Sequence, residues 1–351
     1  MGGTTSMWAD GQIPAADEVD ETLVQVGTQA VIPQQFVGRS PGQLAWMRLR
    51  RDRTAMVSGW ILVFLVATAL LAKPIQWIYG YDGSTQNSGL LDDTGTPLGY
   101  LGGITFSADN ASNHMHIFGV EPSVGRDLFM LVIWGMQTAL IISVMSTVIA
   151  TVFGVIVGIV AAYFGGWVDA IINWFVDYML AFPFLLFCLA VIPVINTRLA
   201  DAYGEVSAEK RVMTIIFVFA GFGWMYTARL VRGQVLSLRE REYVDAARAA
   251  GAGVRHILFR QLLPNLWAPI LVTFSLGVPL TITAEAALSF LNIGVVEPTP
   301  DLGRLILNSS YWLVNDPIYL LIPGTAIFVL VLTFNLFGDA LRDALDPRSS
   351  R

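Results

Sequence analysis

The sequence contains few of the residues that build catalytic, redox or metal sites: one cysteine, three histidines and two lysines among 351 residues. The single cysteine, Cys188, excludes an intrachain disulfide and a cluster of thiolate metal ligands. The net charge of −6 at pH 7 gives no sign of the basic surface that binds nucleic acids, so no nucleic-acid partner is expected. No grouping of Ser, His and Asp stands out, and we predict no catalytic residues.

The two lysines also exclude a nucleotide-binding loop of the P-loop type. Such a loop needs a glycine-rich turn with a lysine directly after a glycine. Here Lys73 follows an alanine and Lys210 follows a glutamate, so the chain contains no Gly-Lys pair. We therefore expect the chain to bind no ATP and no cofactor of its own, and not to be an enzyme by itself.

One pair of histidines, His114 and His116, lies in a polar stretch with acidic residues nearby. Two candidate ligands without a third are a weak indication of a metal, because protein zinc sites have three or four ligands. The sequence therefore predicts a solvated loop here and no metal site.

Apolar residues are abundant. They make up 54% of the chain, the mean hydropathy is +0.60, and they lie in long blocks. A helix of about 20 apolar residues crosses the core of a bilayer, which matches the length of these blocks. We predict an all-α polytopic membrane protein with six transmembrane helices. The expected spans are residues 55–78, 128–163, 168–195, 212–231, 266–291 and 318–338.

The spans define the expected domain organisation. A cytoplasmic N-terminal tail with a basic lead-in (1–54) precedes the first transmembrane helix (55–78), and an extracytoplasmic loop region (79–126) follows. The core (127–340) contains the other five helices, and a cytoplasmic tail (341–351) ends the chain. This orientation places fifteen of the 21 Lys and Arg residues on the cytoplasmic side, in agreement with the positive-inside rule.

Residues 239–264 of the core form the one long arginine-bearing segment that apolar spans enclose. Helical spacing places four residues on one face, a glycine ends that helix, and a second periodic run continues to a proline. The four residues are Tyr243, Ala246, Ala247 and Ala250, the glycine is Gly251, the second run is Val254, Ile257, Leu258 and Leu262, and the proline is Pro264. We interpret the segment as two short helices with a glycine elbow, on which small exposed residues let another protein dock. The alternative is an interfacial helix pair without a partner.

The segment resembles the EAA loop of ABC-importer permeases, whose pattern is Glu-Ala-Ala, a glycine four residues after the second alanine, and a later Leu-Pro. The residues at these positions are Asp245, Ala246, Ala247, Gly251, Leu263 and Pro264. The sequence departs from the pattern at Asp245, where glutamate is usual, and at Gln261, where isoleucine is usual. Together with Tyr243, the matching residues are candidates for contact with an ATPase subunit.

Further motifs extend the resemblance over most of residues 40–348. They are GRDLFMLVIWG at 125–135, AAYFGGWVD at 161–169, DYMLAFPFLL at 177–186, AEAALSFLNIGV at 284–295 and FNLFGDALRDALDPR at 334–348. In this order they are similar to the C-type permease of dipeptide and oligopeptide ABC importers, which works beside a B-type permease.

The resemblance implies the type I fold of ABC importer permeases, in a bacterial inner membrane with both termini cytoplasmic. It also implies ATPase subunits that bind ATP and Mg²⁺, and an extracytoplasmic solute-binding protein. The implied cargo is a di- or oligopeptide, although related systems carry nickel or oligosaccharides.

A self-sufficient secondary transporter or channel is the alternative function. Such a protein is expected to show paired intramembrane charges and an inverted repeat, and the sequence shows no convincing example of either. Two acidic residues, Asp177 and Glu285, do lie within the expected spans, where acids are costly and often functional. Either they contact the cargo, or hydrogen bonds from neighbouring side chains satisfy them; we favour the second interpretation.

The second expected span contains Gly154 and Gly158 in a G-x-x-x-G motif. Two small residues at this spacing let another helix approach closely. We predict a close helix crossing inside one subunit rather than a dimer interface.

Overall fold

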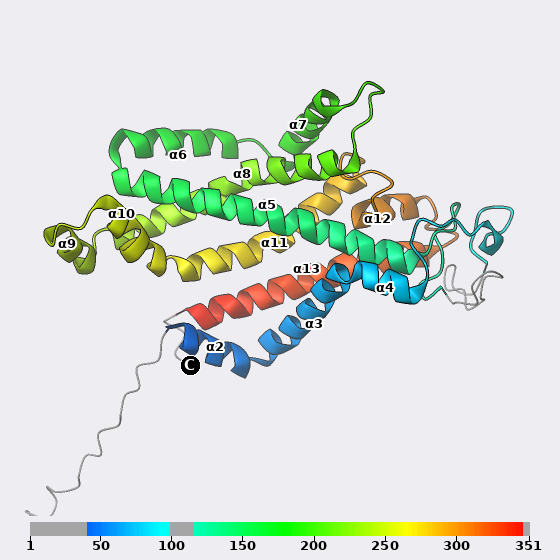
Figure 1. Cartoon of the computed structure of the whole chain (residues 1–351), viewed down its shortest axis with the longest axis horizontal. Helices are drawn as coiled ribbons and strands as arrows, with labels where there is room; N and C mark the ends of the chain where they lie inside the picture. Colours follow the sequence, from blue (N-terminus) through cyan, green and yellow to red (C-terminus); the bar gives the residue numbers. More distant parts are fainter. Residues whose placement is uncertain (1–40, 99–115, 347–351) are drawn as a thin grey trace, which may run out of the picture. The chain divides into compact units, whose positions relative to one another are not determined.

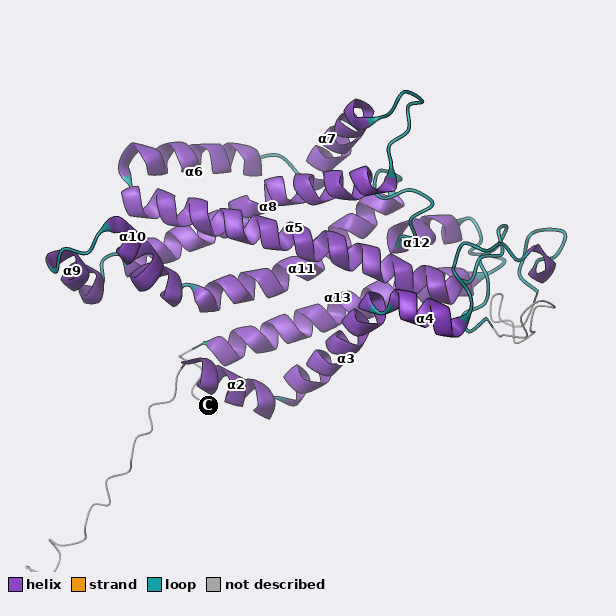
Figure 2. Cartoon of the chain, in the orientation of Figure 1, coloured by secondary structure: helices purple, strands orange, loops and turns teal. Residues whose placement is uncertain are grey.

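The computed structural model describes residues 41–98 and 116–346, and this part of the chain is helical (Figures 1 and 2). Within it, β-type pairing is limited to two isolated bridges, Leu91 with Pro97 and Val120 with Asp127. The predicted all-α fold is confirmed. The N-terminal tail, residues 99–115 of the loop region, among them His114, and residues 347–351 lie outside the described part.

Five helices in the described ranges are long and apolar enough to cross a membrane, and a bent helix pair supplies a sixth span if it crosses as one. The five helices are α3 (Arg53–Leu70), α5 (Leu128–Phe164), α8 (Ala208–Leu238), α11 (Trp267–Phe290) and α13 (Pro317–Leu345). The bent pair is α6 (Gly166–Leu180) and α7 (Phe184–Leu199). The shorter helices are α2 (Pro41–Arg51), α4 (Ala72–Tyr79), α9 (Glu242–Ala249), α10 (Val254–His256) and α12 (Leu302–Ser310).

Helix α5 packs mainly against α8 and also against α11 (Figure 1). A Cβ atom on Gly154 would lie 2.6 Å from the carbonyl oxygen of Trp224. A Cβ atom on Gly158 would lie equally close, 2.6 Å, to the carbonyl oxygen of Ala228. Glycine permits this close approach because it has no side chain. The predicted close crossing is confirmed, and it joins two helices of the same chain.

The first expected span is divided into two helices. Helix α3 ends at Leu70 and α4 begins at Ala72. Pro74 lies in the first turn of α4, where its ring would clash with the carbonyl group four residues earlier in a continuous helix. At the other end, the Asp52 side chain accepts a hydrogen bond from the Thr54 N–H at 2.8 Å and caps α3. A single helix over residues 55–78 is therefore not formed.

The third expected span is bent by 87° between α6 and α7. Pro183 directly precedes α7 and has no N–H with which to continue the ladder of α6. The Arg232 guanidinium of α8 makes two bonds to the Asp169 carboxylate of α6, from Nε at 2.5 Å and from Nη2 at 2.6 Å. Helix α7 packs against α8 as well. Both arms of the bent pair are thus attached to α8.

Buried polar contacts attach the loop region between the first two expected spans to the helices. The Asp127 carboxylate at the start of α5 accepts a hydrogen bond from the Tyr79 hydroxyl at 3.0 Å, and it lies 2.7 Å from His116 Nδ1. His116 is fully buried, with its ring against that of Tyr81. The predicted solvated loop is therefore wrong at His116, because a buried carboxylate supplies the polar partner that solvent would have supplied.

A second buried network connects this region to α13. The Tyr319 hydroxyl donates to one oxygen of the Glu121 carboxylate at 2.6 Å, and Arg126 Nε donates to the other oxygen at 2.6 Å. Arg126 also pairs with Glu297 at 3.1 Å. Burial would lower the pKa of the Arg126 guanidinium, but the Glu121 and Glu297 carboxylates together outweigh it and raise that pKa above its usual value. Arg126 therefore joins two carboxylates from distant parts of the chain.

Candidate coupling element and membrane cavity

Between α8 and α11 the chain folds into a two-armed elbow, which we call the coupling segment (residues 239–264). Its first arm is α9, and its second arm begins with α10. The second arm continues as a π-helix over Ile257–Leu262 and ends in a 3₁₀ turn over Leu263–Asn265. Figure 1 shows the elbow at one end of the bundle, beside the ends of α5 and α8.

Pro264 follows the π-helix of the second arm, which ends at Leu262 before the next span begins, as the sequence predicted. It lies in the first turn of the 3₁₀ helix, and this turn leads directly into α11 through Leu266. A proline is tolerated in the first turn of a helix because the N–H group that it lacks would have no intrahelical partner there. The coupling segment is therefore joined to α11 without a loop.

Gly251 forms the bend of the elbow and adopts the predicted left-handed conformation, with φ +79°. The Ala252 N–H donates to the Ala247 carbonyl at 3.0 Å, and the Gly251 N–H donates to the Arg248 carbonyl at 2.9 Å. These two bonds form a Schellman motif, which satisfies free carbonyl groups at the end of a helix. A Cβ atom at Gly251 would meet no atom within 4 Å. The backbone conformation, and not crowding, requires glycine here.

The inner face of the elbow is apolar and packs on the ends of two spans. Val244 in the first arm is fully buried, and Ile257 and Leu262 in the second arm are at most 2% exposed. Their cluster includes Leu266 and five residues of α5 and α8: Val155, Ile159, Ala162, Val231 and Val235. Burial of each large apolar side chain contributes about 1.5–3 kcal/mol. The elbow is therefore held firmly on α5 and α8.

The outer face of the elbow carries most of the residues predicted to contact an ATPase. Tyr243, Asp245, Ala246, Gly251 and Pro264 are exposed, whereas Ala247 and Leu263 are half-buried. Asp245 pairs with Arg248 at 3.1 Å, and an exposed pair of this kind contributes at most about 1 kcal/mol. The Asp245 carboxylate thus remains accessible to a partner. The Tyr243 hydroxyl accepts a hydrogen bond from Asn265 at 3.4 Å and links the two arms.

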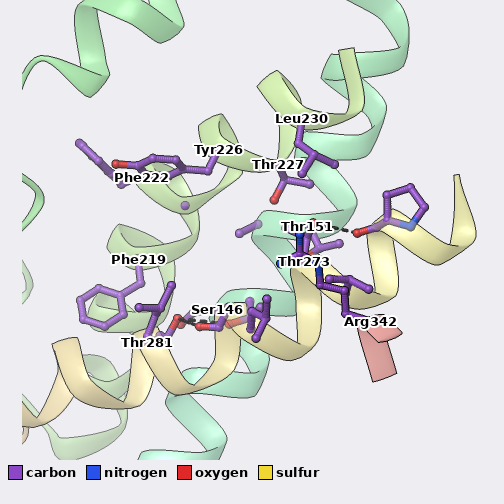
Figure 3. Close-up of a pocket in the computed structure, with 18 of the residues that line it drawn as sticks. Ser146, Thr151, Phe219, Phe222, Tyr226, Thr227, Leu230, Thr273, Thr281 and Arg342 are labelled. Atoms are coloured by element: carbon purple, nitrogen blue, oxygen red, sulfur yellow. Dashed lines mark hydrogen bonds between the residues drawn. The ribbon is translucent and has the colours of Figure 1, made fainter. Parts of the chain in front are cut away.

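A cavity of about 930 Å³ lies between α5, α8, α11 and the end of α13 (Figure 3). Aromatic and aliphatic side chains form part of its wall, and hydroxyl groups of three helices are interspersed among them. The hydroxyl-bearing residues are Ser146, Thr147, Thr151, Tyr226, Thr227, Thr273 and Thr281. The Thr147 and Thr281 hydroxyls lie 3.3 Å apart and connect α5 to α11. Arg342 and Asp346 add charged groups to the wall.

Neither of the two predicted intramembrane acids lines the cavity. Asp177 is exposed and forms an ion pair with Arg229 of α8. Glu285 is fully buried, and one of its oxygens accepts a hydrogen bond from the Ser289 hydroxyl at 3.0 Å. Its carboxyl group also contacts that of Asp301, which precedes α12. The structure therefore separates both acids from the cavity and from the coupling segment.

The cavity hydroxyls were not predicted, although the sequence contains a signal for them. Thr273, Gly277 and Thr281 recur every four residues in α11, which places them on one helical face. All three line the cavity. In an apolar span, a face of small and hydroxyl-bearing residues indicates either helix packing or a polar pathway, and only the packed structure distinguishes the two.

Comparison with known proteins identifies the family. Residues 154–351 match the family model described as binding-protein-dependent transport system inner membrane component. The chain belongs to this family of ABC importer permeases. Residues 40–95 of the permease also match the family model of the N-terminal TM domain of oligopeptide transport permease C. The predicted resemblance to C-type permeases is thereby confirmed.

Alignments with individual relatives extend over most of the permease. It is 34% identical over 313 residues to the glutathione transport system permease protein GsiD of Escherichia coli O6:K15:H31 (strain 536 / UPEC), and the alignment covers 88% of this chain and 91% of the relative. The same identity and coverage hold for GsiD of Shigella boydii serotype 4 (strain Sb227). A solved structure of the MetNI methionine ABC transporter in inward-facing conformations gives a TM-score of 0.48 at 18% identity, covering 62% of this chain and 98% of that chain.

Family membership determines the general role of the protein. The permease is a multi-pass membrane protein of an ABC importer, and the family implies an ATPase and a binding protein as partners. The alternative of a self-sufficient transporter or channel is not favoured.

Proposed function

We propose that this permease imports peptides in a complex with a separate ATPase, to which the coupling segment docks. The packing of the elbow is the main support for this proposal. Its inner face is buried against α5 and α8, and its outer face is exposed. Packed side chains resist relative displacement, so a movement imposed on the outer face reaches both spans. Asp245 and the alanines of the outer face supply the charge and the close backbone approach for docking.

The remaining parts follow from this arrangement. Both termini and the coupling segment lie in the cytoplasm of a bacterial cell, where the ATPase subunits bind ATP and Mg²⁺. A B-type permease completes the membrane pathway, and an extracytoplasmic solute-binding protein delivers the cargo. ATP shifts the permease between its states only if the ATPase binds these states with different affinity. The chain itself binds no nucleotide, metal or cofactor.

The cavity supports a peptide as the cargo. Its volume of about 930 Å³ lies in the range of small-molecule sites, about 300–1,000 Å³. Hydroxyl groups both donate and accept, so they satisfy the N–H and C=O groups of a peptide in several orientations. The described lining includes no histidine or cysteine, which are common ligands of nickel. The names of the relatives refer to glutathione and the matching N-terminal family model refers to oligopeptides, and both support a peptide cargo.

Uptake is expected to require the ATPase in trans. The full complex, reconstituted in vesicles with its binding protein, should accumulate a labelled tripeptide such as glutathione only when ATP is supplied. The permease alone should show neither ATP hydrolysis above background nor uptake driven by an ion gradient. A complex with an inactive ATPase serves as the control. Gradient-driven uptake by the permease alone would overturn the proposed function.

Replacing Thr281 with phenylalanine is expected to lower peptide uptake several-fold, because the added ring fills part of the cavity and removes the hydroxyl contact with Thr147. Leu271 in the same helix is exposed and does not line the cavity, so Leu271→Phe is the matched control. The initial rate of uptake is measured for both variants in vesicles that contain equal amounts of complex. Equal rates for the two variants would exclude the cavity as part of the pathway.

A further inference from the structure

Three arginines gather where α2 meets α3. Arg50 and Arg51 end α2, and Arg53 begins α3. All three side chains are exposed, and within the described part of the chain none of them forms an ion pair or a side-chain hydrogen bond. Arg232, by contrast, is held by a carboxylate on a neighbouring helix. The three exposed guanidinium groups therefore have unused hydrogen-bond donors, which favours an anionic partner outside the described chain.

The surface beside these arginines is apolar. Trp46 lies one helical turn before Arg50 and is 59% exposed. One face of α3 continues from Arg53 through exposed apolar side chains at i+4, i+7 and i+11: Val57, Trp60 and Phe64. In a membrane protein such a face lies against acyl chains, and tryptophan prefers the boundary between acyl chains and headgroups. The arginines are therefore at headgroup level.

We propose that Arg50, Arg51 and Arg53 form a binding site for an anionic phospholipid. A guanidinium group offers two parallel N–H donors that match the oxygens of a phosphate, and it attracts a negatively charged headgroup. The exposed face of α3 contacts the acyl chains of the same lipid. Assignment to the cytoplasmic leaflet rests on the proposed orientation, whereas lipid binding itself does not.

The site is connected to the cavity through α13. Helix α2 packs against α13, and Figure 1 shows the two side by side near the end of α13. The Arg48 guanidinium donates to the Asp346 carbonyl at 2.7 Å, directly after that helix. Asp346 and Arg342 are also part of the cavity wall. A lipid that holds the junction of α2 and α3 thus fixes the position of the end of α13 beside the cavity.

The full-length permease, purified in detergent, is titrated with phosphatidylglycerol or phosphatidylcholine of identical acyl chains, and bound lipid is counted by native mass spectrometry. The parental chain should bind phosphatidylglycerol more tightly than phosphatidylcholine, and added salt should reduce this difference in affinity. The variant R50Q/R51Q/R53Q should bind phosphatidylglycerol roughly 100-fold more weakly, since each of the three arginines near an anionic surface contributes about fivefold. Phosphatidylcholine binding should be unchanged.

A matched control removes the same charge from the coupling segment. Arg241, Arg255 and Arg260 are also exposed and lack side-chain partners in the described chain, so R241Q/R255Q/R260Q should retain the preference. If both variants lose the preference for phosphatidylglycerol equally, the effect comes from net charge alone and the proposed lipid site is wrong.

The acidic N-terminal tail is the competing partner for the three arginines. The full-length variant D10N/D17N/E18Q/D20N/E21Q removes the acidic charges of the tail. If only this variant prefers phosphatidylglycerol to phosphatidylcholine, the arginines bind the tail in the parental chain and the lipid proposal is wrong. None of these measurements involves ATP or cargo.

Discussion

Valine at position 251 is expected to reduce ATP-driven uptake by roughly tenfold or more while the permease still inserts into the membrane. Gly251 has φ +79°, a conformation that costs a β-branched residue about 1–3 kcal/mol. The chain relieves this strain by breaking the Schellman motif and turning the second arm away from the first. Each 1.4 kcal/mol of strain lowers the population of the parental conformation tenfold, so only a small fraction of the molecules would keep the elbow in its docking geometry.

Gly253 provides the matched control for this substitution. It lies two residues further along the same elbow and has φ −70° and ψ 162°, and a Cβ atom there would meet nothing within 4 Å. Gly253→Val should therefore retain most of the parental uptake. Uptake and ATP hydrolysis are measured in reconstituted vesicles, and co-purification reports whether the ATPase is attached. Parental uptake by Gly251→Val, or equal losses in both variants, would contradict docking through this elbow and favour the unpartnered interfacial helix pair.

Alanine at position 158 is expected to destabilise the permease by about 1–3 kcal/mol, although it adds a single methyl group. The new Cβ would lie 2.6 Å from the Ala228 carbonyl oxygen and 3.0 Å from Val231 Cβ. A backbone carbonyl inside a helix cannot rotate away, so α5 and α8 must separate along their contact. Since the coupling segment packs on the same two helices, uptake should fall with stability.

Thermal unfolding of the purified permease in detergent measures this effect. Gly221→Ala in α8 is the control, because a Cβ atom there would meet nothing within 4 Å. Alanine is also the better helix former by about 1 kcal/mol, so the control should unfold at the parental temperature or above it. An unchanged unfolding temperature for Gly158→Ala would show that the contact between α5 and α8 is looser than the structure indicates.

Local sequence determined much of this protein. Apolar blocks of bilayer length indicated the membrane helices, because every backbone polar group must be satisfied inside a membrane and a helix achieves this within one segment. They did not indicate that the first block is divided between α3 and α4, or that the third is bent between α6 and α7. Helical spacing followed by Gly251 defined the elbow, since a helix end with positive φ depends on a few consecutive residues. The spacing of Gly154 and Gly158 indicated a close helix crossing for the same reason.

Only the tertiary structure decided what each helical face contacts. Periodicity singled out Tyr243 and the alanines of α9, but Val244 is the residue that anchors the first arm, because the ends of α5 and α8 lie beneath it. His116 is buried because Asp127 folds against it, and the cavity exists because hydroxyl faces of α5, α8 and α11 meet. Except for the pair of His116 and Asp127, these contacts join segments far apart in the chain. Their energy depends on packing between helices, which no local pattern of residues specifies.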